Sequence, residues 1–160
     1  MDILTEKGKI SLEDEQFLAE WFKKEFCLNY IQTPKDQPAA VDAIISNKDS
    51  TKLMAVAETK CRYELTLEQF QTTFNNEWLV TWAKFQKTIE IANALGVTSV
   101  GLLYLVKPKI VLMQRISEPD GKLVAPIRLL TTETQATING GKIFRTNAYI
   151  NMEEAKVYTI

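Results

Sequence analysis

Histidine is absent from the 160 residues of this chain. Its absence excludes Ser-His-Asp and Cys-His catalysis, nucleases of the His-Asn-His type and most zinc enzymes, because all of these depend on an imidazole. If the chain is an enzyme, carboxylates and lysines must carry the chemistry. Oxygen ligands of that kind suit Mg²⁺ or Mn²⁺ better than zinc.

Cysteine is scarce and long apolar runs are missing. The two cysteines, Cys27 and Cys61, do not form a Cys-x-x-Cys motif, and two reduced thiols are favoured over a disulfide. No apolar run approaches the roughly 20 residues of a membrane span, and the polar first residues do not resemble a signal segment. We therefore expect a cytoplasmic protein that makes no membrane contact and folds as a single domain over residues 1–160.

Charge is nearly balanced over the whole chain, with a net charge of −1, but it is unevenly distributed. Residues 1–60 carry eight basic and eleven acidic side chains, whereas residues 107–160 carry eight basic and five acidic ones. An acidic region beside a basic C-terminal third is compatible with a metal site next to a phosphate backbone. It is equally compatible with an ordinary solvated surface.

The spacing of apolar residues predicts helices and strands in a mixed order. Residues 1–10 are expected to be a loose lead-in, with Ser11 as the cap of the first helix. The predicted helices are 12–26, 67–74 and 77–95. The predicted strands are 27–33, 39–46, 52–62 and 98–106, then 109–117, 122–130, 134–138 and 142–150. The fold class expected is α/β, of the α+β kind with a mixed sheet, because helices link strand 52–62 to strand 98–106 as a crossover.

Two neighbouring core strands carry charges where a buried strand should have none. Asp42 interrupts the apolar run 39–46, and Glu58 and Lys60 end the run 52–62. Because side chains alternate along a strand, Glu58 and Lys60 point to the same face. Buried charges are costly unless they are paired. Two carboxylates and an ammonium in one place therefore indicate either a buried ion-pair network or a divalent metal site.

Asp42, separated by fifteen residues from Glu58-Thr59-Lys60 on the next strand, resembles the core motif of the PD-(D/E)XK nuclease superfamily. The resemblance covers residues 11–106 and implies an αβββαβ restriction-endonuclease-like core, with residues 107–160 as a β-hairpin extension. The proline that usually precedes the first aspartate is missing, since Val41 stands there. The resemblance implies Mg²⁺ or Mn²⁺ held by Asp42 and Glu58.

The resemblance also implies roles for four further residues. The backbone carbonyl of Thr59 would complete the metal site, and Lys60 would position the attacking water. Glu15, near the start of the first helix, is the candidate for an additional acidic ligand, although a solvated acid is the simpler interpretation. Gln86 matches the residue type that orients the metal-bound water or the scissile phosphate, and it is equally explained as an edge residue of its helix.

Basic residues on the last predicted helix and hairpin are candidate contacts to a DNA backbone. They are Lys84, Lys87, Lys142 and Arg145. No acid lies between Glu133 and Glu153, an interval that contains the last two of these residues. The alternative is that these charges only protect edge strands from pairing with another chain.

Three functions are compatible with these observations. The first is a Mg²⁺-dependent deoxyribonuclease, such as a small phage or mobile-element enzyme, that leaves 5′-phosphates. The second is a non-catalytic nucleic-acid-binding module on the same fold. The third is a structural or assembly subunit that uses the β-rich C-terminal third as an interface. A nuclease of this size that cuts duplex DNA is expected to act as a homodimer, with one site for each strand.

Overall fold

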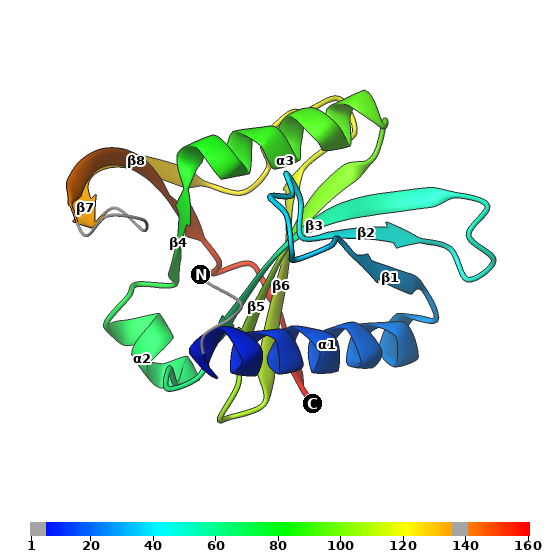
Figure 1. Cartoon of the computed structure of the whole chain (residues 1–160), viewed down its shortest axis with the longest axis horizontal. Coiled ribbons are helices and arrows are strands. Elements are labelled where there is room, and N and C mark those ends of the chain that lie inside the picture. Colours follow the sequence, from blue (N-terminus) through cyan, green and yellow to red (C-terminus); the bar gives the residue numbers. More distant parts are fainter. Residues whose placement is uncertain (1–5, 136–140) are drawn as a thin grey trace.

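A six-stranded mixed sheet lies between two helices in the computed structural model, which describes residues 6–135 and 141–160 (Figure 1). In spatial order its strands are β1 (Asn29–Gln32), β2 (Ala43–Ser46), β3 (Leu53–Arg62), β5 (Thr98–Leu105), β6 (Ile110–Ser117) and β9 (Lys156–Thr159). Strands β3 and β5 are parallel, and every other neighbouring pair is antiparallel. The predicted class, with helices on a mixed sheet, is thereby confirmed. Within the described ranges no helix is long and apolar enough to cross a membrane.

The two faces of this sheet are covered by different helices. Helix α1 (Glu6–Phe26) packs Leu18 and Phe22 against a face that includes Ala57 of β3 and Leu102 of β5. Helix α3 (Trp82–Ala94) lies on the opposite face. There its Ala92 packs with Val56, and its Phe85 packs with Leu103. Odd-numbered residues of β3 therefore face α1, and even-numbered residues, Glu58 and Lys60 among them, face α3.

A second, three-stranded sheet adjoins the first. Its order is β4 (Glu77–Thr81), β8 (Lys142–Asn151) and β7 (Ile127–Gln135), all antiparallel, and a short helix α2 (Leu67–Thr72) precedes β4. Its inner residues Trp78 and Ile150 join the core beneath α3. Strands β7 and β8 extend from the body as a curved ribbon, which we call the arm (Figure 1). The arm curves so that one of its faces is turned towards the main sheet.

Two predicted helix boundaries are wrong. Helix α1 is already formed at Glu6, so Ser11 lies inside the helix and does not cap it. Residues 77–81 form strand β4 and not the first turns of the predicted helix 77–95. Trp78 and Val80 are buried while Leu79 between them is exposed. That period of two fits a strand, which is also favoured by the aromatic and β-branched residues of this segment.

Several strand boundaries also differ from the prediction. Strand β2 begins at Ala43, so Asp42 lies immediately before it and not within it. The predicted strand 122–130 begins only at Ile127. It pairs with β8 and not with β6. The preceding segment contacts β6 through a bridge between Ser117 and Leu123 and through the N–H of Val124, which donates to the Ile116 carbonyl at 2.9 Å. The predicted strand 134–138 is partly the end of β7, and its residues 136–138 lie outside the described ranges. Strand β9 was not predicted.

Candidate functional site

Asp42 is held at the point where the edge of β3 becomes uncovered. The β2–β3 pairing ends at Ala43 and Ala57, so the next residues of β3 have no partner strand on that side. Asp42 fills the gap, because its Oδ2 accepts a hydrogen bond from the Thr59 N–H at 2.9 Å. Its own N–H donates to the Ala57 carbonyl at 3.1 Å, and its carbonyl accepts from the Thr33 N–H at 3.0 Å. These backbone contacts fix the position of the carboxylate at the edge of β3.

Glu58 projects from β3 to the α3 face, where it is only 4% exposed. Its neighbour across the parallel pair is Gly101 of β5. The indole of Trp78 occupies the space above Gly101, where an added Cβ would lie 2.5 Å from the ring. Glu58 therefore has an aromatic wall on one side, and its Oε2 is buried with no hydrogen-bond partner among the described residues.

Lys84, in the first turn of α3, joins the two carboxylates. Its Nζ lies 2.9 Å from Asp42 Oδ1 and 2.7 Å from Glu58 Oε1. Asp42 and Glu58 thus approach a single cation position from two different segments of the chain. The Lys84 side chain is 38% exposed, so it reaches this position from the solvent side.

A second ion pair continues the network towards α1. Lys35 Nζ lies 3.5 Å from Asp42 Oδ1 and 2.9 Å from Glu15 Oε2. Glu15, predicted as a further metal ligand, lines the same cavity but is separated from Asp42 by Lys35. The sheet explains this separation, because α1 covers the face of Thr59, while Glu58 lies on the face covered by α3.

Burial and neighbouring charges shift the pKa values of the group in opposite directions. Burial would raise the pKa of Asp42, but Lys84, the Thr59 N–H and Lys35 together hold it below its usual value. Burial, reinforced by the Asp42 charge, raises the pKa of Glu58 to about 7, against the opposing effect of Lys84. The pKa of Lys84 is raised, since the two carboxylates outweigh its burial.

Lys60 follows Glu58 on the same face and lies beside it. Burial lowers the pKa of Lys60, and the charges of Arg62 and Lys84 lower it further, although Glu58 and Asp42 oppose the shift. The sequence left the direction of this shift undetermined, because burial and the carboxylates act against each other. The structure shows that burial dominates. A lysine with a lowered pKa gives up a proton more readily than a surface lysine.

Two adjoining hollows surround these charges. The first, which we call the carboxylate cavity, has a volume of about 220 Å³ and contains Glu15, Lys35, Asp42, Glu58, Thr59, Lys60 and Lys84 in its lining. The second, which we call the basic groove, has a volume of about 300 Å³. It shares Glu58, Lys60 and Lys84 with the cavity and adds Arg62 of β3 and Arg145 of the arm. The arm therefore brings a cation from far along the chain to the carboxylates.

The other sequence-predicted residues lie further away. Gln86 is exposed on α3 and does not line either hollow. At about 100° per residue it projects about 160° away from Lys84. Lys87 is exposed and lines a shallow depression beside Lys84. Lys142 lies on the arm, where its Nζ is 3.8 Å from Glu133 Oε2.

Lys84 and Lys35 are the two site residues whose positions the sequence did not reveal. Lys84 was expected to contact nucleic acid and not the carboxylates. Helix α3 starts at Trp82 and not at residue 77 as predicted, and its buried residues are Phe85, Thr88 and Ala92. Thr88, one turn after Lys84, donates to the Ala40 carbonyl at 3.3 Å, so this side of α3 faces the segment before Asp42. Lys35 lies in a loop, where no periodicity indicates direction.

A divalent cation fits the donor atoms of the carboxylate cavity. The described part of the chain has no cluster of three or more acidic, cysteine or histidine side chains that could hold a metal ion. Mg²⁺ does not need one, because it commonly takes one or two carboxylates and completes its shell with water and substrate phosphate. The Thr59 carbonyl points to the same edge of β3 as its N–H, towards Asp42. Glu58 Oε2, which has no hydrogen-bond partner among the described residues, is a further oxygen available to such an ion.

No protein-family model, no curated protein and no solved structure matches this chain.

Proposed function

We propose that the protein is a Mg²⁺-dependent nuclease that hydrolyses phosphodiester bonds of DNA and leaves 5′-phosphates. The observation that supports this most directly is the convergence of Asp42 and Glu58 on one cation position, with Glu58 Oε2 buried and unpartnered. A structural ion pair would satisfy both oxygens of a buried carboxylate. This one leaves a buried oxygen without a partner, on a residue that lines the same cavity as Lys60.

The order of elements supports the same proposal. Helix α1, strands β1 to β3, helix α3 and strand β5 follow the αβββαβ order that the PD-(D/E)XK resemblance implies. Asp42 precedes the second of these strands, and Glu58-Thr59-Lys60 lies on the third. Strand β4 and helix α2 stand between β3 and α3 as an insertion in that order. The C-terminal strands β6 and β9 extend the main sheet, and β7 and β8 form the arm.

In the proposed mechanism each residue has a distinct task. Asp42, Glu58 and the Thr59 carbonyl would hold the Mg²⁺. The ion would supply electrophilic activation of the scissile phosphate and of the attacking water. Lys60 positions the attacking water, and its lowered pKa increases the fraction of neutral amine that is able to accept a proton. Lys84 leaves the carboxylates through its exposed side and turns to the phosphate, and Arg62 and Arg145 hold the neighbouring backbone.

A cleavage assay tests this function. Supercoiled plasmid, linear duplex, single strands and a four-way junction are incubated with Mg²⁺ or Mn²⁺ and with wild type, Glu58→Gln or Lys60→Met. We expect metal-dependent cutting by wild type and at least a hundredfold loss in both variants, since each removes a part of the metal or water site. Glu64→Gln and Lys142→Met are matched controls, because both residues are exposed and lie outside the two hollows.

Lys84 favours one alternative, a nucleic-acid-binding module without catalysis. Its ammonium already neutralises Asp42 and Glu58, as a permanent counter-ion would. In that case Mg²⁺ would not raise the melting temperature, and DNA would bind equally well in EDTA and in Mg²⁺. Absence of both cutting and a Mg²⁺-dependent thermal shift would contradict the nuclease and leave this alternative.

A further inference from the structure

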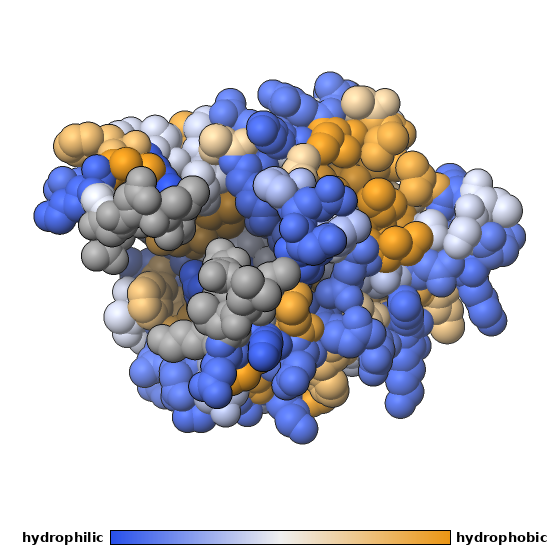
Figure 2. Space-filling view, viewed as in Figure 1, coloured by the Kyte–Doolittle hydropathy of each residue, from blue (hydrophilic) through white to orange (hydrophobic). Residues whose placement is uncertain are grey.

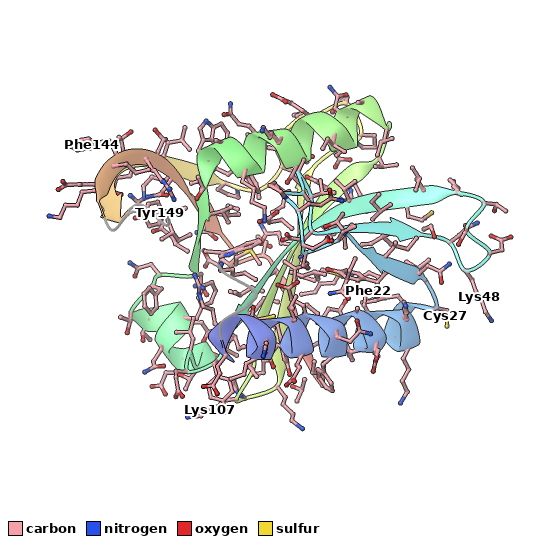
Figure 3. All side chains as sticks on the ribbon, viewed as in Figure 1. Phe22, Cys27, Lys48, Lys107, Phe144 and Tyr149 are labelled. Carbon is pink, nitrogen blue, oxygen red and sulfur yellow. The ribbon has the colours of Figure 1, made fainter. Side chains whose placement is uncertain are left out.

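A hollow of about 840 Å³ is lined mainly by apolar and aromatic side chains. We call it the aromatic pocket. It lies between the end of β3, helix α2, strand β4 and the inner side of the arm, and its aromatic lining consists of Tyr63, Phe70, Phe74, Trp78 and Tyr149. Figure 2 shows the surface hollowed beneath the arm. Figure 3 shows Tyr149 on the inner side of the arm and Phe144 on its outer side.

Two rings at the rim of this pocket are about half exposed, although Lys107 Nζ lies over one face of Tyr63, 5.6 Å from the ring centre. Tyr63 is 53% exposed and Phe74 is 50% exposed. Neither belongs to the three clusters that form the buried core. Trp78 and Phe70 form deeper parts of the lining and are almost fully buried. Exposed aromatic faces above an apolar floor are suited to a flat, partly apolar ligand.

The pocket is continuous with the basic groove. Arg62, Trp78 and Leu79 line both hollows. The groove in turn shares Glu58, Lys60 and Lys84 with the carboxylate cavity. A polymer whose phosphate lies at the carboxylates would therefore pass four cations, contributed by Lys60, Arg62, Lys84 and Arg145, before it reaches the rings.

Charge within the pocket does not oppose such a polymer. Its two acids are each paired, Glu64 with Lys107 at 2.6 Å and Glu77 with Arg128 at 2.7 Å. Arg128 also lies over the ring of Tyr149, 4.2 Å from its centre. The anionic part of a ligand thus meets cations in the groove, and its apolar part meets rings in the pocket. That division matches a nucleic acid strand, whose backbone is charged and whose bases have apolar faces.

We propose that the aromatic pocket binds unstacked bases of single-stranded DNA, adjacent to the phosphate held at the carboxylate cavity. The proposal rests on the proposed function for the position of that phosphate, but base binding itself needs neither metal nor cleavage. Bases within a duplex present only their edges, so their faces cannot reach Tyr63 and Phe74. The preferred substrate is therefore a single strand, or a single-stranded segment next to a duplex.

Binding in EDTA tests this proposal separately from catalysis. Fluorescence anisotropy is measured with a labelled oligothymidine, with the same strand carrying abasic sites and with a duplex of equal length. Wild type should bind the base-bearing strand most tightly. Tyr63→Ala and Phe74→Ala should each weaken that binding roughly tenfold, since stacking on one ring contributes about this much. Neither variant should change binding of the abasic strand.

Phe144→Ala is the matched control, because Phe144 is 77% exposed but lies on the outer side of the arm. It should leave all three affinities unchanged. Equal affinity of wild type for base-bearing and abasic strands would overturn the proposal. The proposal would also be overturned if Tyr63→Ala and Phe74→Ala weakened binding of the base-bearing and the abasic strand equally, or weakened binding of neither. If binding depends on the bases but no substrate is cut, the nuclease proposal fails and the proposal of base binding in the aromatic pocket stands. If DNA is cut but binding does not depend on the bases, the base-binding proposal fails and the nuclease proposal stands.

Discussion

At the scale of single residues, Asp42 and Glu58 have opposite pKa shifts although they contact the same ammonium. Asp42 receives two further favourable contacts, from the Thr59 N–H and from Lys35, and its pKa is lowered. Glu58 has Lys84 and, to a smaller extent, Lys60 to offset its burial and the Asp42 charge, and its pKa rises to about 7. Near neutral pH the pair therefore carries less than two full negative charges. A second cation beside Lys84 would favour ionisation of Glu58 and so restore the second negative charge.

The raised pKa of Glu58 predicts that stability falls as the pH rises. Between pH 4.5, its ordinary pKa, and about pH 7, the folded state keeps a proton that the unfolded state has released. Unfolding is thus increasingly favoured across this window, by on the order of 2 kcal/mol in wild type. Glu58→Gln removes the ionisation and should lose much less stability between pH 5 and pH 8. Urea unfolding in EDTA at the two pH values measures the difference.

Glu64→Gln serves as the matched control for this experiment, because Glu64 lies just beyond the same strand but is exposed. It should behave as wild type does. The lowered pKa of Asp42 acts in a lower window, where stability is lost as the pH falls below its ordinary value of 3.8. If wild type and Glu58→Gln lost equal stability between pH 5 and pH 8, burial would not be the main influence on Glu58.

At the scale of elements, the close contact of Trp78 on β4 with Gly101 on β5 connects the two sheets beside Glu58. Gly101→Ala would place a methyl group 2.5 Å from the indole, which is buried and cannot shift freely. We expect a loss of about 1–3 kcal/mol in the free energy of unfolding, the usual cost of overpacking a core. We also expect reduced metal-dependent cleavage, because the displaced indole borders both the groove and the pocket.

Gly141→Ala is the control for this substitution, since a Cβ at that position meets nothing within 4 Å. Chemical denaturation of the two variants at one pH makes the comparison. Equal stability of both variants would show that β4 adjusts its distance from the main sheet without cost.

Local patterns predicted five of the six strands of the main sheet and missed β9, and they failed over residues 77–81, where a helical and a strand period both fit. The β2–β3 hairpin and the β3–β5 crossover follow from apolar runs, turn residues and an intervening helix, all of which are local. Residues 77–95 contain apolar positions that satisfy a helical stripe, and the alternation over residues 77–81 is too short to exclude it. Pairing of this segment with β8, about 70 residues later, decided its conformation. Propensity cannot reveal such a distant partner.

At the scale of the whole molecule, folding brings the basic C-terminal third to the acidic first third. Arg145 enters the groove that Glu58 and Lys60 also line. If the four cations of the groove bind phosphates of a single strand, the logarithm of affinity should fall with the logarithm of salt with a slope of about −3. Arg145→Ala should reduce that slope by about 0.7.

Anisotropy titrations at several salt concentrations in EDTA give these slopes. Lys142→Ala is the appropriate comparison, because Lys142 lies on the same strand of the arm but is paired with Glu133 outside the groove. Its slope should equal that of wild type. An equal decrease in both variants would mean that the strand follows the outside of the arm.

The candidate site was predictable only where sequence proximity implied spatial proximity. Glu58 and Lys60 share a face by strand alternation, and Asp42 is one hairpin away from them. The position of Lys84 depends on where α3 starts, and that of Arg145 depends on the curvature of the arm, so neither could be read from local patterns. Glu15 was predicted on the correct helix, but that helix covers the other face of the sheet.

The hydrogen bonds around Asp42 also make the preceding loop a convenient insertion point. The Thr33 N–H and hydroxyl bind the carbonyls of Asp42 and Val41, so both ends of segment 34–41 are fastened independently of its length. Gln37 lies exposed at its middle. Because the closure entropy of a loop rises only slowly with length, an affinity tag or a fluorescent reporter spliced after Gln37 would leave the carboxylate in place. The protein thus offers an attachment point close to its candidate site.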